Sequence, residues 1–364
     1  MVFLLRWLIR AWLICRGQSL GVLAWSVLPG YRRLAVRNLN IACGGERSRR
    51  ELRRLVRRHF QLLTANLLSS TKIGTLPLEE IGALFETENA EAVHRELRAG
   101  KPVVLVLSHL GNWELLTRCF PKIFSYARIG TVYQKLGNRH LDEHISRMRH
   151  RAGVELFDRG EGFRNAIELL KSGGLVGVLS DQHAGDHGLW TPFFGRLAST
   201  TPLPALLAKR TGAALIAAAP YTTTVGHWKI VFTDRFDSAN ESVQALTAKG
   251  NHVIAEQIRR APEDWFWVHN RWKTPKPNFL LTRYKRGIFV PPEISPRALK
   301  PFRILIRGSN WLGDTVMSVP AVRATKARRP DEHVAIARAA GLASIWTLVA
   351  EVDEEIQLPC RAPF

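Results

Sequence analysis

The sequence has few cysteines, and their spacing excludes two classes of site. The four cysteines, Cys15, Cys43, Cys119 and Cys360, form no C-x-x-C pair in a chain of 364 residues. A zinc site built from cysteines and a disulfide framework are therefore not expected. A reducing compartment fits this cysteine usage.

The sequence also lacks a long uncharged apolar run. Residues 2–30 are apolar but three arginines interrupt them, and the longest charge-free run covers only residues 17–31. A spanning helix needs about 20 apolar residues, and internal arginines do not fit a signal peptide. We expect residues 1–30 to form a membrane anchor helix with tryptophans at headgroup depth, either spanning or lying flat. An amphipathic core helix is the alternative.

Acidic residues are scarce relative to basic ones. The chain has 52 Lys and Arg against 31 Asp and Glu, and a formal net charge of +21. Such a charge favours an anionic partner, namely nucleic acid, an acidic membrane surface or a phosphorylated substrate. Residues 1–80 hold 14 basic and 4 acidic residues, so nearly half of the excess lies there.

A cationic helix is predicted directly after the apolar stretch. Arg49, Arg53 and Arg57 follow one another at i, i+4, and Leu52 and Val56 supply an apolar face. Each arginine near an anionic bilayer contributes about 1 kcal/mol of attraction. A solvated charged face is the alternative. Nucleic acid is not expected as a partner, because the sequence has no helix-turn-helix, zinc-finger or RNP-like motif.

Residues 86–270 alternate apolar runs with helical patterns, as in PVVLVLS followed by HLDEHISRMRHRAG. This alternation predicts an α/β sheet covered by helices on both faces, with ligands at the carboxyl ends of the strands. Proline-rich segments then separate a second strand–loop–helix pattern. The predicted domains are a membrane anchor at 1–30, a catalytic domain at 31–285, a linker at 286–301 and a short fragment at 302–364.

The candidate chemistry lies in VVLVLSHLGNWELL, where His109 follows a buried strand and Glu114 comes five residues later. About one such pair is expected by chance, and a second pair, His150 and Glu155, lies in a surface-like segment. The strand end distinguishes the first pair. A histidine there can take the proton of a hydroxyl that attacks a thioester, while a carboxylate holds the other ring nitrogen. No G-x-S-x-G motif predicts a covalent serine.

Several blocks resemble one family. SHLGNWE resembles the H-x4-D/E signature of glycerolipid-type acyltransferases. VRNLNIAC, VYQKLGNRHLDEHISRMRHRAG, FDRGEGFRNAIELLKSGGLVGVLSDQHAG, TPFFGRLASTT and APEDWFWVHNRWKT are similar to blocks of the late acyltransferases of lipid A, in register over about residues 1–280. The resemblance implies a glycerolipid-acyltransferase-like mixed sheet covered by helices.

The resemblance also implies an activity. A fatty acyl chain would move from acyl carrier protein, or from acyl-CoA, to a hydroxyl of a lipid A precursor at the cytoplasmic face of the cell inner membrane. No metal and no other cofactor would be needed. Acylation of another glycerolipid or glycolipid is the alternative reading.

On this resemblance His109 is the catalytic base and Glu114 its partner. The residues expected to bind substrate or to support the site are Asn112, Tyr133, Asn138, Arg159, Asp181, Arg271 and Lys273.

Their expected roles differ. Arg159 would bind phosphate or thioester oxygens, or be a surface cation. Asp181 would orient a side chain at the site, or cap a helix. Arg271 and Lys273 would meet substrate phosphates, or face an anionic lipid surface. A metal at Asp181 and its neighbouring histidines is not expected, because glycines make that segment a loop.

The C-terminal stretch ILIRGSNWLGDTVMSVPAVRATKA resembles the first βαβ unit of heptosyltransferase-type glycosyltransferases of family 9. The resemblance would place Asp314 at an acceptor site. The fragment is too short for a glycosyltransferase of two Rossmann domains, although a lipopolysaccharide glycosyltransferase-related module is an alternative. An isolated βαβ unit cannot bury both of its faces, so we expect poor packing unless it docks on the first domain.

Overall fold

The computed structural model describes residues 10–135, 137, 139–224, 226–238, 240–273 and 286–359. The chain divides into two compact units. The first comprises the residues up to 183 together with 200–271, and the second comprises 184–199 together with the residues from 272 onward. Segment 184–199, which we placed in the catalytic domain, thus groups with the C-terminal residues.

A seven-stranded sheet forms the centre of the first unit, in the order β1-β9-β8-β2-β5-β3-β4. Its strands are β1 (Phe85–Glu88), β2 (Val103–Leu107), β3 (Ile129–Tyr133), β4 (Val154–Asp158), β5 (Leu175–Leu179), β8 (Ala214–Thr224) and β9 (His227–Phe232). All neighbours are parallel except β8 and β9. The predicted α/β class with a mixed sheet is confirmed.

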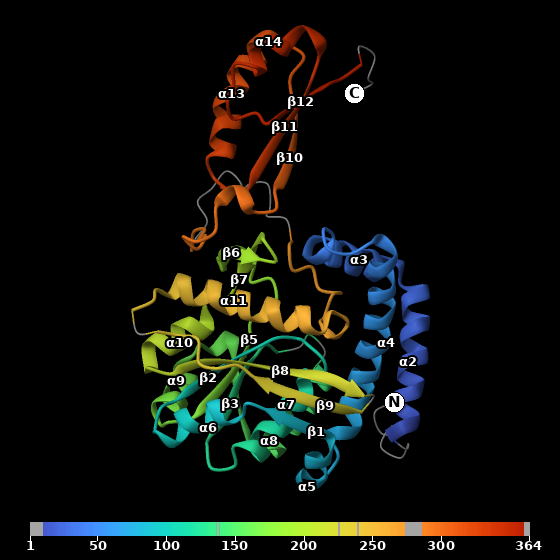
Figure 1. Ribbon diagram of the computed structural model, residues 1–364. Coiled ribbons are helices and arrows are strands. Elements are labelled where there is room, and N and C mark those ends of the chain that lie inside the picture. Colours follow the sequence, from blue (N-terminus) through green and yellow to red (C-terminus); the bar gives the residue numbers. More distant parts are fainter. Residues whose placement is uncertain are drawn as a thin grey trace. The chain divides into compact units, whose positions relative to one another are not determined.

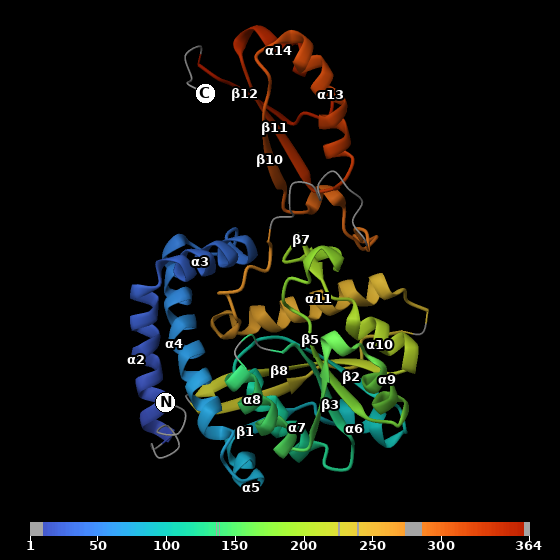
Figure 2. The same cartoon turned by 180° about the vertical axis from the view of Figure 1, so that it is seen from behind.

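Helices cover both faces of this sheet. They are α5 (Leu78–Ile81), α6 (Glu91–Arg98), α7 (Leu116–Ile123), α8 (Arg139–Arg151), α9 (Arg164–Lys171), α10 (Leu203–Thr211) and α11 (Val243–Arg260). Figures 1 and 2 show α10 and α11 on one face, and α6 and α7 on the other. β2 is central, and all five of its residues are buried. Continuous apolarity therefore does mark a strand covered on both sides.

The first described helices, which precede the sheet in the sequence, are α2 (Arg10–Val27), α3 (Pro29–Cys43) and α4 (Arg49–Ile73). α2 lies along α4 in both views (Figures 1 and 2), and this contact is close, because a Cβ added at Gly21 would lie 2.4 Å from the Phe60 carbonyl oxygen. Ser48 and Glu51 form a capping box at the start of α4. The predicted cationic helix is confirmed, with Leu52 and Val56 buried.

The predicted anchor falls partly outside the described residues, which begin at residue 10. Within the part of the chain that the structure describes, no helix combines the length and apolarity needed to cross a bilayer.

The second unit contains a parallel three-stranded sheet in the order β10-β11-β12 and a hairpin of two strands. Its elements are β6 (Leu189–Phe193), β7 (Arg196–Thr200), β10 (Phe302–Arg307), α13 (Leu312–Lys326), β11 (Glu332–Arg338), α14 (Ala343–Trp346) and β12 (Glu354–Gln357). The order β10, α13, β11 is the predicted βαβ unit. Its likeness to a glycosyltransferase stays a prediction.

The C-terminal residues of this unit pack on the hairpin. Trp190 and Leu197 of the hairpin form a buried cluster with Leu299. The guanidinium of Arg329 lies 5.1 Å from the Trp190 ring centre and 4.4 Å from that of Phe302. The fragment therefore packs on segment 184–199, which lies within the range that we assigned to the catalytic domain.

Candidate active site

His109 and Asp181 lie together because β2 and β5 are parallel neighbours. β2 ends at Leu107 and β5 at Leu179, in matching register. The Ser180 N–H donates to the Leu107 carbonyl at 3.0 Å, which extends the pairing by one residue. The residues that follow the two strands therefore meet at the carboxyl edge of the sheet, where α/β proteins bind ligands.

Asp181 forms two hydrogen bonds with His109. The His109 Nδ1 lies 2.7 Å from Asp181 Oδ1, and the His109 backbone N–H donates to Asp181 Oδ2 at 2.8 Å. A carboxylate accepts a hydrogen bond, so the neutral imidazole carries its proton on Nδ1, and its Nε2 keeps a lone pair that can take a proton. Gln182 Nε2 lies 3.4 Å from that Nε2. The arrangement suits a general base.

A loop after α11 forms the opposite wall of the site. The Trp265 indole N–H donates to Asp181 Oδ2 at 2.6 Å, and the Phe266 backbone N–H donates to the His109 carbonyl at 3.0 Å. The rings of Trp113 and Phe266 lie 5.2 and 6.0 Å from the imidazole. The His109 side chain is 16% exposed and that of Asp181 is 1% exposed, so only the imidazole reaches the surface.

Gly111 allows the turn after His109 to pass close to β8. Its φ is +54°, and an added Cβ would lie 1.9 Å from the Pro220 carbonyl oxygen. Its N–H donates to the Asp264 carbonyl at 2.9 Å. A larger residue would clash and would strain the backbone, so this glycine is needed for the close approach.

The electrostatic environment keeps Asp181 ionised. Burial acts to raise the pKa of the Asp181 carboxyl, but the electrostatic effect of the neighbouring His109 and the hydrogen bonds from His109 and Trp265 outweigh it, so the net pKa is lowered. Burial lowers the pKa of His269 to about 4, although Asp181 opposes that shift. The His269 Nε2 accepts from the His183 backbone N–H at 3.0 Å, which fits a neutral ring.

Arg271 is a buried part of the site. Its side chain is fully buried, and it donates to Thr200 Oγ1 at 2.7 Å and to Asn251 Oδ1 at 3.4 Å. Burial lowers the pKa of Arg271 to about 10, and the charge of Asp181 opposes that shift. This buried position favours the supporting role that we allowed for Arg271, and its contact with substrate stays a prediction.

Glu114 does not pair with His109, which corrects the expected contact. Its two carboxylate oxygens accept from Arg149 Nη2 at 2.9 and 3.0 Å. Residues 113–115 form a short 3-10 helix, and that turn aims Glu114 at α8. The carboxylate that binds His109 is that of Asp181, which follows β5 and is far away in the sequence. The part that Glu114 plays in the reaction stays a prediction.

The other predicted residues spread along the same edge of the sheet. Asn112 is buried, and its Oδ1 accepts from the Ser70 hydroxyl at 2.7 Å and from the Leu115 N–H at 3.3 Å. It therefore supports the turn that carries Trp113.

Tyr133 ends β3 and is partly buried, whereas Arg159 follows β4 and is exposed. Neighbouring strands lie about 4.8 Å apart, so these strand ends are roughly 10 and 14 Å from that of β2. The structure thus brings neither into contact with His109. Lys273 is exposed. Asn138 lies outside the described residues.

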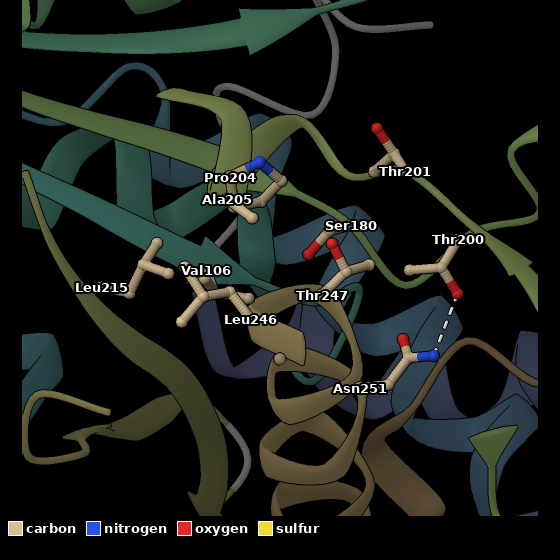
Figure 3. A pocket seen from close by; sticks show the side chains of 11 residues that line it. Val106, Ser180, Thr200, Thr201, Pro204, Ala205, Leu215, Leu246, Thr247 and Asn251 are labelled. Atoms are coloured by element: carbon tan, nitrogen blue, oxygen red, sulfur yellow. Dashed lines mark hydrogen bonds between the residues drawn. The ribbon is translucent and has the colours of Figure 1, made fainter. Parts of the chain in front are cut away.

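A small cavity adjoins the site beneath α10 and α11 (Figure 3). Figure 3 shows Leu215 and Leu246 at one end, and Thr200 bonded to Asn251 at the other. Ser180, directly before Asp181, also lines it. A second cavity lies on the other side, around Glu114 and Arg149. Among the residues that the structure describes, no group of three His, Cys, Asp or Glu side chains is placed to hold a metal ion.

Sequence reasoning missed three residues around the site: Trp265, Arg149 and Asn38. Trp265 contacts Asp181, and Arg149 contacts Glu114. Asn38 contacts the loop after α11. All three contacts join elements that are distant in the sequence, so no local spacing could have indicated them. Trp265 and Asn38 do lie in blocks that carry the resemblance, APEDWFWVHNRWKT and VRNLNIAC. Their position in these blocks is the sequence feature that could have pointed to Trp265 and Asn38.

Comparisons with known proteins show the family of this chain. Residues 1–274 match the model of the family described as bacterial lipid A biosynthesis acyltransferase. The lipid A biosynthesis lauroyltransferase of Escherichia coli (strain K12) is 27% identical over 74% of this chain and 87% of its own length. The lipid A biosynthesis palmitoleoyltransferase of the same strain is 24% identical over 71% and 84%.

A relative whose name gives a different substrate has a similar sequence identity. The phosphatidylinositol mannoside acyltransferase of Mycolicibacterium smegmatis is 24% identical over 72% of this chain and 88% of its own length. The matched family model covers His109, Asp181 and the loop that holds them. The chain therefore is an acyltransferase and belongs to the bacterial lipid A biosynthesis acyltransferase family.

Proposed function

We propose that this acyltransferase moves a fatty acyl chain from the thioester of acyl carrier protein to a hydroxyl of a lipid A precursor, at the cytoplasmic face of the inner membrane. The acyl thioester is the co-substrate, and no cofactor is needed. The observation that carries the proposal is the His109–Asp181 pair, which leaves Nε2 of the imidazole as a base at the ligand-binding edge of the sheet.

The reaction follows from the tautomer that Asp181 fixes. The Nε2 of His109 takes the proton of the acceptor hydroxyl as its oxygen attacks the thioester carbonyl carbon. The carbon–oxygen bond forms, the carbon–sulfur bond breaks, and the proton passes from the imidazolium to the leaving thiolate. The buried Asp181 carboxylate stabilises the imidazolium between these two steps.

The N-terminal helices support contact with an anionic membrane. Leu20, Leu23, Val27 and Leu28 are between 42% and 60% exposed on α2 and at its end. The exposed guanidiniums of α4 lie on the neighbouring helix. Exposed apolar side chains beside arginines suit a helix that lies in the lipid interface.

A second candidate acceptor is a mannosylated phosphatidylinositol. It is favoured by the mycobacterial relative, whose identity of 24% is close to that of the lipid A enzymes. The chemistry at His109 would be the same, since in both reactions a hydroxyl of the acceptor attacks the acyl thioester. The two candidates differ only in the acceptor.

The test uses purified full-length protein, labelled acyl carrier protein, and a panel of the two acceptors. We expect the lipid A precursor to gain the mass of one acyl chain. His109→Ala should lower this rate by about 10²–10⁴-fold, the usual contribution of a general base. His150→Ala is the matched control, because His150 lies exposed on α8 and should not affect the rate. Transfer only to the mannoside, or full activity of His109→Ala, would refute the proposal.

A further inference from the structure

Asn38 of α3 is fully buried, and its side chain holds the loop that closes on the active site. Its Nδ2 donates to the Trp267 carbonyl at 2.8 Å and to the His269 carbonyl at 2.7 Å. Carbonyl oxygens only accept hydrogen bonds, so the amide nitrogen must face them. One buried side chain thus satisfies two backbone acceptors two residues apart, which would otherwise be costly to bury.

The held loop reaches the site at more than one point. Trp265 forms an isolated antiparallel bridge with Leu110, directly after His109. Its indole N–H is one of the donors on Asp181 Oδ2, the other being the His109 backbone N–H. His269, whose carbonyl Asn38 binds, accepts from the backbone N–H of His183. The conformation of the loop and that of the Asp181 carboxylate are therefore linked.

We propose that Asn38 is a positioning residue for acyl transfer, which acts through Trp265 on Asp181 and so on the tautomer of His109. The proposal rests on the proposed function. Asn38 touches no reacting atom. It fixes the loop conformation in which the Trp265 indole meets Asp181, and Asp181 then presents Oδ1 to the Nδ1–H of His109.

A merely structural role would give a different result, and Asn66 of α4 provides the comparison. Asn66 is also buried, and its amide bonds the Trp228 indole N–H at 3.1 Å and the Thr222 hydroxyl at 3.4 Å. Neither partner touches His109 or Asp181. Asn66→Ala should therefore lower the melting temperature as Asn38→Ala does, and leave kcat near that of the parent protein.

The experiment is a double-mutant cycle in kcat of the full-length protein, with Asn38→Ala, Trp265→Phe and the double variant. Phenylalanine keeps an aromatic ring but has no N–H donor. We expect kcat to fall at least about tenfold in each single variant, with KM nearly unchanged. If Asn38 acts through Trp265, the double variant should be no slower than Trp265→Phe. Trp265→Tyr, which regains a donor hydroxyl, should recover part of the loss.

A second measurement does not depend on the substrate. The rate at which diethyl pyrocarbonate modifies His109, followed by peptide mass spectrometry across pH, reports the state of its free Nε2. The midpoint pH should shift equally in Asn38→Ala, Trp265→Phe and the double variant, and remain unchanged in Asn66→Ala. Independent, multiplying effects on kcat, or a parental midpoint in Asn38→Ala, would overturn the proposal. If the parent protein acylates neither acceptor while the midpoints shift as expected, only the proposed function fails.

Discussion

Two carboxylates near the active site have the same charge and opposite surroundings. Asp181 is 1% exposed and accepts hydrogen bonds from the His109 backbone, the His109 ring and the Trp265 indole. Glu114 is 24% exposed and pairs with Arg149, whose side chain is 14% exposed. Asp181 binds the imidazole, whereas Glu114 binds a neighbouring helix.

The difference shows that sheet topology, rather than distance along the chain, decides which acid serves the histidine. Glu114 follows His109 by five residues but starts a helical turn that carries it away. Asp181 comes 72 residues later, and the parallel register of β2 and β5 returns it to the same edge.

The largest expected effect comes from changing the buried carboxylate. In Asp181→Asn the amide can donate to Nδ1, which favours the wrong tautomer of His109 and removes the charge that stabilises the imidazolium. We expect kcat to fall by about 10³–10⁴-fold. The measurement is single-turnover acyl transfer. Asp186→Asn, five residues further in the same segment, is the control and should keep the parental rate. A loss of kcat smaller than tenfold in Asp181→Asn would contradict the conclusion that Asp181, rather than Glu114, serves His109.

Much of the fold could be predicted from local pattern. The apolar runs at β2, β5 and β8 and the helical periodicity of α8, α9 and α11 fixed the α/β class, because burial on both faces requires continuous apolarity. The sequence pattern did not indicate β7, which covers residues 196–200. That segment is polar at its end, with Ser199 and Thr200, and pairing with β6 decides its conformation.

The site was predictable only in part, because strand ends can be located from sequence but their pairings cannot. His109 and Asp181 were both expected at strand ends, yet nothing in the sequence says that β5 lies beside β2. The pairing of Glu114 with Arg149 and the bond from Trp265 to Asp181 depend on contacts across 35 and 84 residues. Local spacing gives no information about such contacts.

Low pH should destabilise the region around Asp181 more than the region around Glu114. The loop that covers Asp181 also contacts His59, which is 1% exposed and lies 3.3 Å from the Glu263 carbonyl. Burial lowers the pKa of His59 to about 4 from an ordinary 6.5. Between these values the unfolded chain binds the proton and the folded chain does not, so the free energy of unfolding falls as pH is lowered from about 6.5 to 4.

Replacing that imidazole should flatten the dependence. His59→Gln should reduce the change in unfolding free energy between pH 7 and pH 4 by on the order of 3 kcal/mol, measured by urea denaturation. His150→Gln, at an exposed position of α8, should reproduce the parental slope. An unchanged slope in His59→Gln would show that this imidazole is hydrated and that the loop is open. Among the side chains that the structure describes, no histidine lines the cavity around Glu114, so this test concerns the Asp181 region.

The smallest expected effect concerns the other carboxylate. Glu114→Gln, Arg149→Met and the double variant form a cycle in unfolding free energy. The pair is neither fully exposed nor fully buried, so its coupling should lie at about 1–2 kcal/mol, between the values for surface and buried pairs. Because Trp113, which precedes Glu114, contacts the His109 ring, kcat should also fall, by about tenfold in Glu114→Gln.

The cycle decides what Glu114 does, because stability and rate must move together if its role is to hold the turn against α8. Arg149→Met removes the same ion pair from the other side, so it should lower kcat about as much as Glu114→Gln, and the double variant should be no slower than either. If Glu114→Gln instead lost as much rate as Asp181→Asn, with unfolding free energy intact and Arg149→Met fully active, Glu114 would act on the substrate itself. The carboxylate that the sequence placed beside His109 would then move there during the reaction, and only Asp181 would keep the position seen in this structure.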